Sequence, residues 1–313
     1  MLVMPVSERA SPFYKRKIFT FTLVTSLREP CKGPKQSIKF KKDIKMNTTI
    51  FFAGTGNMGG AILRGLLNAG TDAKNIFFFD PSDKAAEAVS ALGCVRVKSF
   101  AEGIEKANVT FLCVKPQIFK LVAAEWKAAA SALKSEKTFI SIMAGVARKS
   151  LIEVLGEKNQ VLRVMPNLPL TVGKGSVGLA TDGVSEETLK LAEEIFGNIG
   201  VTCRVAESLI DAVTGLSGSA PAYVFEFIEG LTRGGVKAGL TRDVALKLAL
   251  GTIEGSVELV KQSGKSPSDL CAMVCSPAGT TIAGIDALEE GAFRSTLIKA
   301  VVAGTNRSKE LGK

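Results

Sequence analysis

The residues best suited to chemistry in this sequence form a glycine-rich turn, Gly54-Thr55-Gly56-Asn57-Met58-Gly59. The turn matches the pattern G-x-G-x-x-G, follows the apolar stretch TIFFA and opens the segment MGGAILRGLL. In this setting Gly54 permits a tight turn, Gly56 lets backbone amides approach a pyrophosphate, and Gly59 lets a helix pack closely on a strand. The start of the helix adds partial positive charge. The turn therefore predicts a dinucleotide site, and a glycine-rich turn without a ligand is the less favoured interpretation.

An acidic residue, Asp80, ends the next predicted strand. A carboxylate at this position can accept a hydrogen bond from the ribose 2′-hydroxyl of NAD. It would repel the 2′-phosphate of NADP unless Ser82 and Lys84 reach that phosphate and Asp80 turns away. Asp80 could instead only cap the following helix through Pro81-Ser82. The sequence leaves both NADH and NADPH open as the cofactor.

A second polar cluster, Ser276-Pro277-Ala278-Gly279-Thr280-Thr281, precedes the helix-period segment IAGIDALEE. Small residues, hydroxyls and exposed amides at the start of a helix suit the binding of a carboxylate. The cluster could equally be an elaborate N-cap. Its position alone does not separate the two interpretations.

Histidine is absent from the sequence. This excludes Ser-His-Asp hydrolases, Cys-His proteases, histidine-ligated metal sites and dehydrogenases that depend on a histidine acid. Of the six cysteines only Cys271 and Cys275 are close in sequence, and they lack the second ligand pair of a structural zinc site. We expect no metal and reduced thiols, as in a cytoplasmic protein.

Apolar segments rich in β-branched and aromatic residues alternate with helix-period segments from Thr48 onward. The predicted strands are Thr49–Ala53, Ile76–Asp80, Val109–Val114, Thr138–Ile142 and Val161–Met165. The predicted helices are Met58–Ala69, Ser82–Leu92, Gln117–Leu133 and Ala147–Leu155. This alternation predicts an α/β fold, a Rossmann-type doubly wound and mainly parallel sheet. We expect three more segments to extend that sheet: Gly173–Ala180, Glu186–Phe196 and Val201–Val205.

The pattern changes after about Ser208, where no convincing strand follows. Helices are predicted over Pro221–Ala238, Thr241–Lys261, Ser268–Val274, Ile282–Glu290 and Phe293–Leu311. The first two are apolar on several faces, so they need more partners than a domain of this size supplies. We therefore predict a dinucleotide-binding domain over 47–207 and an all-α domain over 208–313 that packs between subunits.

Residues 1–46 form a basic extension that carries 11 of the 40 Lys and Arg residues and three of the 30 acids. The rest of the chain is nearly balanced in charge, which argues against a nucleic-acid partner. The extension could be a targeting or transit peptide, but it matches their rules poorly. The favoured interpretation is that it is disordered or not part of the native protein, with translation starting at Met46. No apolar run approaches the roughly 20 residues of a membrane span, so we expect a soluble protein.

Six motifs in this order and spacing resemble those of pyrroline-5-carboxylate reductases. They are GTGNMG, Val114-Lys115-Pro116, Arg163-Val-Met-Pro-Asn167, TGLSGSAPAY (Thr214–Tyr223), GGVKAGL (Gly234–Leu240) and CSPAGTTIAG (Cys275–Gly284). The resemblance covers Asn47 to the end. It implies the NAD(P)H-dependent reduction of 1-pyrroline-5-carboxylate to L-proline, the final step of proline biosynthesis, by a homodimer formed through the C-terminal helices and often assembled into a ring of dimers.

The resemblance also implies roles for single residues. Residues Gly54 to Met58 would hold the cofactor pyrophosphate. Val114, Lys115 and Pro116 would line the nicotinamide-ribose region, and Met165, Pro166 and Asn167 the pocket near the ring. Substrate would be bound by Ser276, Gly279, Thr280 and Thr281, with the Thr281 hydroxyl as the catalytic group near the imine nitrogen. Lys115 could instead be a solvated charge, and Pro166 and Asn167 could only shape a turn.

Some positions depart from the family pattern: Ser266, Leu168, Ala220 and Ala278. An asparagine that many relatives place near the 2′-phosphate is replaced around Ser99-Phe100. These departures motivate a non-catalytic nucleotide-binding paralogue as one alternative. The other is an oxidoreductase like the β-hydroxyacid dehydrogenases, with Lys237 or Lys247 as its helical lysine, but it leaves the SPAGTT loop unexplained.

Overall fold

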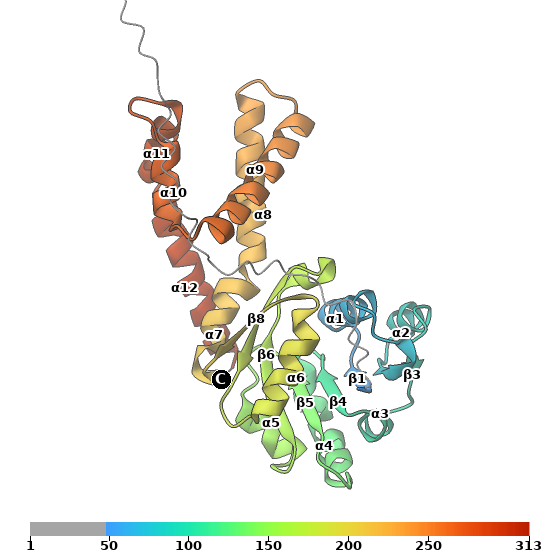
Figure 1. The fold of residues 1–313 in the computed structure, drawn as a ribbon. Coiled ribbons are helices and arrows are strands. Elements are labelled where there is room, and N and C mark those ends of the chain that lie inside the picture. Colours follow the sequence, from blue (N-terminus) through green and yellow to red (C-terminus); the bar gives the residue numbers. More distant parts are fainter. Residues whose placement is uncertain (1–47, 313) are drawn as a thin grey trace, which may run out of the picture. The chain divides into compact units, whose positions relative to one another are not determined.

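The computed structural model describes residues 48–312, and the predictions for the basic extension lie outside this range. The described chain contains an eight-stranded sheet with strand order β3-β2-β1-β4-β5-β6-β7-β8 (Figure 1). The strands are β1 (Ile50–Ala53), β2 (Ile76–Phe79), β3 (Val95–Arg96), β4 (Val109–Leu112), β5 (Thr138–Ser141), β6 (Gln160–Met165), β7 (Gly175–Ala180) and β8 (Gly200–Val205). All neighbouring pairs are parallel except β6 and β7. The mainly parallel sheet confirms the predicted fold class.

Two sets of helices cover the two faces of the sheet. The first set is α1 (Asn57–Asn68), α2 (Asp83–Ser90) and α6 (Glu186–Gly197), and the second is α3 (Phe100–Lys106), α4 (Pro116–Ser131) and α5 (Arg148–Leu155). Successive strand residues point to opposite faces. Phe52 accordingly packs with the first set, stacked on Phe111 at 4.8 Å. Phe51 packs with the second set, against Phe100. Strands buried on both faces explain the continuous apolar runs in the sequence.

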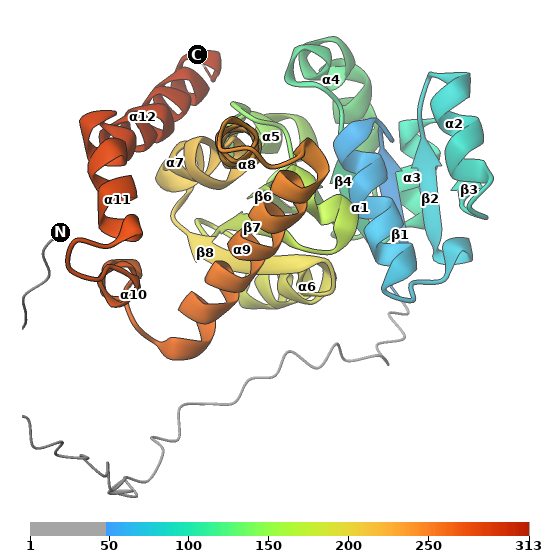
Figure 2. The same cartoon turned by 90° about the horizontal axis from the view of Figure 1, so that it is seen from above.

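Helices follow the last strand to the end of the described chain (Figures 1 and 2). They are α7 (Ile210–Val213), α8 (Ala220–Lys237), α9 (Arg242–Ser263), α10 (Pro267–Val274), α11 (Thr280–Glu290) and α12 (Phe293–Leu311). A π-helical turn, η4 (Thr214–Gly218), joins α7 to α8, and the short 3-10 turns are η1 (Ala73–Asn75), η2 (Leu168–Val172) and η3 (Glu207–Leu209).

The longest helices of this C-terminal part leave apolar side chains uncovered. On α8 and α9 the only buried residues are Thr232, Ala245 and Ala249. Phe225 is 56% exposed and Leu248 57% exposed. Exposed apolar surface on this scale marks a site of association. In the single chain, these helices therefore lack the further packing partners that the sequence analysis predicts they need.

The elements that were predicted agree with the structure within two residues at each end, with one exception in type. Glu186–Phe196 was expected to extend the sheet, but Glu186–Gly197 is helix α6, which connects β7 to β8. Ser185 caps it by accepting a hydrogen bond from the Thr188 amide, and two acids occupy its first turn. These are signals of a helix start that the sequence carried. Within residues 48–312 no helix is long and apolar enough to cross a membrane.

Candidate functional site

The glycine turn lies at the carboxyl end of β1, between the ends of β2 and β4. The Gly54 amide donates to the Phe79 carbonyl at 2.9 Å, and Gly54 has φ +96°, a backbone conformation that favours glycine. A Cβ at Gly59 would lie 2.6 Å from the Gly54 carbonyl oxygen and 2.8 Å from the Cys113 Cβ. Burial raises the pKa of the Cys113 thiol, so this side chain packs as a neutral group. Gly54 and Gly59 therefore perform the structural roles that the sequence predicted.

Gly56 is different, because it is exposed and no atom lies within 4 Å of the position of a Cβ there. It is the N-cap residue of α1, which has no side-chain cap and no acid in its first turn. The first amides of a helix need acceptors from outside the helix. In α2, by contrast, the Ser82 side chain accepts a hydrogen bond from the Ala85 amide. The start of α1 thus offers open amide donors and positive partial charge, as a pyrophosphate requires.

Asp80 is buried beside this turn, at the end of β2. One carboxylate oxygen accepts hydrogen bonds from the Thr55 amide and the Thr55 hydroxyl, and the other accepts from the Ser82 amide at 2.9 Å. Both oxygens are therefore engaged by the chain itself. The bond to Ser82 supports a role at the next helix start, which was the alternative for Asp80. The bonds to Thr55 add a role in shaping the glycine turn. Direct contact with a ribose stays a prediction.

The other residues assigned to the cofactor follow strands at the same edge of the sheet. Val114, Lys115 and Pro116 follow β4 after Cys113; Lys115 is exposed and Pro116 begins α4. Met165 ends β6, and Pro166 and Asn167 after it are buried. The chain order reverses between β1 and β4, where open α/β sheets bind their ligands. The fold thus places all three groups of predicted cofactor residues along one edge.

The hydroxyl-rich loop joins α10 to α11. The Gly279 amide donates to the Ser276 carbonyl at 3.0 Å, and Ala278 has φ +56°. A turn with proline second and a left-handed third residue is a type II turn, which usually has glycine at the third position. Gly279 is the N-cap residue of α11, and no side chain caps that helix. The loop hydroxyls are therefore not used as an N-cap, and Ser276 and Thr280 are exposed.

The two polar clusters lie apart within one chain. In Figures 1 and 2 the loop between α10 and α11 is remote from the start of α1. A hydride can pass only between atoms in close contact. Within this single chain the two clusters are therefore not placed to act on one substrate.

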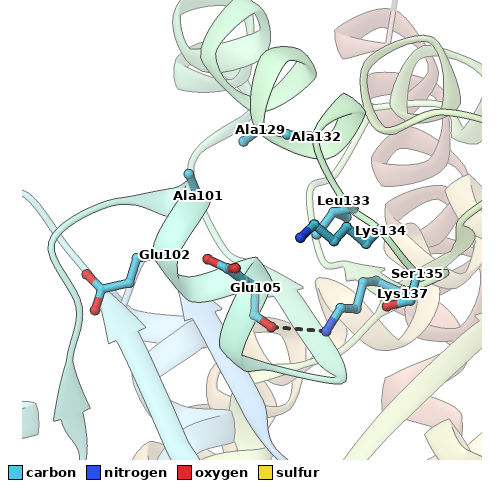
Figure 3. A pocket seen from close by; sticks show the side chains of 9 residues that line it. All are labelled: Ala101, Glu102, Glu105, Ala129, Ala132, Leu133, Lys134, Ser135 and Lys137. Carbon is cyan, nitrogen blue, oxygen red and sulfur yellow. Dashed lines mark hydrogen bonds between the residues drawn. The ribbon is translucent and has the colours of Figure 1, made fainter.

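Two cavities among residues 48–312 do not coincide with either cluster. One of about 400 Å³ lies between α3 and α4, and its lining includes Glu102, Lys134 and Lys137 (Figure 3). The Lys137 ammonium donates to the Glu105 and Ala107 carbonyls, which closes the end of α3. This cavity is at the amino end of β5, opposite to the glycine turn. In the same residues no group of three or more His, Cys, Asp or Glu side chains is placed to hold a metal ion.

Sequence reasoning missed the π-helical turn η4 and its contact with Asn167. The Asn167 amide nitrogen donates to the Ser217 carbonyl at 3.1 Å, and its side-chain oxygen accepts from the Ser176 amide at 2.8 Å. The available signal was the glycine pair in TGLSGS: a Cβ at Gly215 would collide with the backbone of α12, whereas one at Gly218 would closely approach only the end of the Met165 side chain.

Two family models match the chain. The model described as pyrroline-5-carboxylate reductase dimerisation matches residues 207–311, and the model described as NADP oxidoreductase, coenzyme F420-dependent, matches residues 49–145. The first begins at the turn η3 after the last strand, and the second spans the glycine turn and β4.

Curated and solved relatives match most of the chain. The pyrroline-5-carboxylate reductase of Methanosarcina acetivorans is 40% identical over 270 residues, which cover 85% of this chain and 99% of the relative. That of Pisum sativum is 39% identical and covers 84% of this chain and 96% of the relative. The crystal structure of Plasmodium falciparum pyrroline carboxylate reductase with NADP bound has 34% identity and a TM-score of 0.77, and covers 86% of this chain and all of the other.

Proposed function

The chain belongs to the pyrroline-5-carboxylate reductase family, and we propose that its two polar clusters carry out the reduction of 1-pyrroline-5-carboxylate to L-proline with NADPH or NADH. One observation supports this assignment of the clusters most directly. Helices α1 and α11 both begin at a glycine N-cap, Gly56 and Gly279, without a side-chain cap and without an acid in the first turn. A dinucleotide and an imino acid each bring an anionic group that such a helix start can bind.

The glycine turn is the proposed cofactor site. Amides of Gly56, Asn57 and Met58 would donate to the pyrophosphate. The position of Thr55 is fixed by hydrogen bonds from its amide and hydroxyl to the Asp80 carboxylate. Residues Val114 to Pro116 would border the nicotinamide ribose, and residues Met165 to Asn167 would lie near the ring. When bound, the cofactor supplies the hydride.

The loop before α11 is the proposed substrate site. Amides and hydroxyls of Ser276, Gly279 and Thr280 would bind the substrate carboxylate, and Thr281 would lie near the imine nitrogen. A protonated cyclic imine is already electrophilic, so the chain needs to supply orientation and charge stabilisation more than a strong acid or base. A protein without histidine can meet this requirement.

The substrate site would be completed by a second subunit. We place the dimer interface on the exposed apolar faces of α8 and α9, within the region matched by the dimerisation model. In such a dimer Thr281 of one subunit faces the glycine turn of the other. This arrangement corresponds to two domains, 47–207 and 208–313, with the nucleotide site on the first. A ring of dimers, a cytoplasmic location and the absence of a nucleic-acid partner remain predictions of the same proposal.

The proposal is tested first by steady-state reduction of 1-pyrroline-5-carboxylate with NADPH and with NADH. Proline formation is expected with at least one of them. Binding of a cofactor without turnover would favour the non-catalytic paralogue, and oxidation of a β-hydroxyacid instead would favour the dehydrogenase alternative.

A mixing experiment tests whether two subunits share the site. A variant with a blocked nucleotide turn, Gly56→Asp, and the variant Thr281→Val are each expected to lose most activity. Unfolded and refolded together, they form mixed dimers in which one site has both an intact turn and an intact Thr281. Activity should therefore return toward about one quarter of wild type, from random pairing of two chains. If each site lay within one chain, mixing would restore nothing.

A further inference from the structure

The connection between α7 and α8 is a π-helical turn. In η4 the Ser219 amide donates to the Thr214 carbonyl at 2.9 Å, five residues back. Turns of this kind insert one residue into a helix, and they occur mostly as single bulges near functional sites. This one lies directly after the last strand and α7, where the chain passes from the sheet into the long helices.

Asn167 connects this turn to the sheet. Its side-chain oxygen accepts from the Ser176 amide at the start of β7, and its side-chain nitrogen donates to the Ser217 carbonyl inside η4. The residue is only 7% exposed. A buried carboxamide that bonds a backbone donor on one side and a backbone acceptor on the other has one favourable orientation. It therefore fixes η4 relative to β7.

Glycines bring η4 close to neighbouring groups on two further sides. A Cβ at Gly215 would lie 2.5 Å from the Val301 carbonyl oxygen and 2.6 Å from the Thr305 nitrogen, both on α12. A Cβ at Gly218 would lie 2.8 Å from the end of the Met165 side chain. The turn is thus packed between α12 and the residues that end β6, and Asn167 supplies its polar link to them.

We propose that Asn167 is a positioning residue that keeps η4 in its π-helical form and thereby sets the direction in which α8 leaves the sheet. Relaxation of the turn to an ordinary α-helix would remove one residue from the bulge. That change rotates the following helix by about 100° and shifts it by about 1.5 Å. Because α8 carries the proposed dimer interface, such a shift would move the partner's Thr281 relative to the nicotinamide. This inference rests on the proposed function.

The substitution Asn167→Asp tests the hydrogen-bonded link between β7 and η4, because aspartate has nearly the same shape as asparagine. The carboxylate still accepts from the Ser176 amide, but it places a second acceptor against the Ser217 carbonyl in place of the donor. Breaking a buried hydrogen bond in this way also lowers stability, so a control for general destabilisation is needed.

The chain offers a matched control in Asn159. This asparagine is 2% exposed, its side-chain oxygen accepts from the Lys137 amide at 2.9 Å, and its side-chain nitrogen donates to the Leu155 carbonyl at 2.6 Å. It precedes β6 at the opposite edge of the sheet. Asn159→Asp therefore breaks an equivalent link that is remote from η4 and from both polar clusters.

The experiment measures cofactor affinity by fluorescence titration and the melting temperature of each variant. Turnover is measured at a temperature well below the melting temperatures of both variants. Asn167→Asp should lower kcat about 10-fold or more, the scale for a small misplacement of reacting groups. Because Asn167 also borders the proposed nicotinamide pocket, the Kd for NADPH should rise, but by a smaller factor than kcat falls. Deuterium at the transferred position of NADPH should slow the variant more than wild type, since hydride transfer becomes the slow step. Asn159→Asp should lower the melting temperature with wild-type kcat.

Three results would overturn the positioning role: wild-type kcat in Asn167→Asp, an equal fractional loss of kcat in both variants, or a loss of NADPH affinity that accounts for the change. If Asn167→Asp does not fold, the uncharged variant Asn167→Ala is measured against Asn159→Ala. An inactive wild-type protein in the parallel assay would refute the proposed function itself, so the two failures are distinguishable.

Discussion

The carboxylate of Asp80 accepts hydrogen bonds from both the amide and the hydroxyl of Thr55, at 2.8 and 3.0 Å. This pairing connects the end of β2 to the second residue of the glycine turn. An acid at this position thus supports the surface on which a pyrophosphate would lie, since it orients the backbone just before Gly56. Because the pyrophosphate is common to NADH and NADPH, this geometry gives Asp80 no preference between the two cofactors.

Replacement of Asp80 by alanine is expected to weaken the binding of NADH and of NADPH to a similar extent. The amide and the hydroxyl of Thr55 lose their acceptor, and the pyrophosphate bound by this turn is present in both cofactors. A hydrogen bond to a charged group contributes about 1.5–3 kcal/mol, so Kd should rise about 10- to 150-fold. Isothermal titration with each cofactor measures this, with the exposed Asp83→Ala as the control. A loss confined to NADH would instead identify Asp80 as the ribose ligand.

Thr281→Val is expected to lower turnover by about 10- to 1000-fold, the range for the loss of one oriented donor in a transition state. Valine keeps the β-branched shape and removes only the hydroxyl. Nucleotide affinity should not change, because the proposed pyrophosphate contacts are made by the amides of the glycine turn and not by the Thr281 hydroxyl. The companion variant Thr280→Val should mainly raise KM, since its proposed contact is with the substrate carboxylate. Wild-type turnover in Thr281→Val would remove the catalytic role, and a joint loss of nucleotide affinity and melting temperature would make Thr281 structural.

Ala278→Gly is expected to stabilise the protein by about 1 kcal/mol, because a left-handed conformation costs an L-residue about 1–2 kcal/mol and glycine offsets part of this by its greater freedom when unfolded. Ala292, with φ +50° at the start of α12, provides a control away from the loop. Both glycine variants should raise the denaturation midpoint, and only Ala278→Gly should change KM for the substrate. Equal kinetics in the two variants would show that the conformation of Ala278 does not affect substrate binding.

Acid should abolish the contribution that the ion pairs of Arg204 with Glu186 and Glu193 make to the free energy of unfolding. Hydrogen bonds from the Arg204 guanidinium lower the pKa of Glu186 and of Glu193. Carboxyls with a lowered folded-state pKa stabilise the fold above their unfolded pKa, and this stabilisation is lost as pH falls through the folded pKa. Arg204→Met should therefore melt below wild type near pH 7, and the difference should vanish toward roughly pH 2. Melting curves over this range check the sign, and a difference that grows in acid would contradict it.

The sequence predicted those parts of the fold whose residues are specified by local chemistry. Continuous apolar runs such as IFFA identify strands buried on both faces, and the glycine spacing of the turn identifies the first helix start. Strand β3 was not predicted, because two residues, Val95 and Arg96, carry no periodicity. Glu186–Phe196 was misassigned although Ser185 and the acids after it mark a helix start.

The arrangement of the site depended on contacts that no local pattern encodes. Asn167 was assigned to the nicotinamide pocket, and its link to Ser217 spans 50 residues of sequence. The position of Asp80 in the chain left ribose contact and helix capping both open, and the contact of its carboxylate with Thr55 is not encoded by that position. Type II turn geometry at Ala278 could not be inferred either, since alanine is an unusual residue for that conformation.

In the proposed dimer the exposed side chains of α8 and α9, Phe225 and Leu248 among them, would be buried, so the stability of the protein would depend on its concentration. When folded chains associate and unfolded chains do not, mass action raises the melting temperature as protein is added. Dilution should therefore lower the melting temperature, and the C-terminal helices should lose their protection from hydrogen exchange before the sheet does. For this chain the amount made in the cell would itself help to determine how much of it is folded.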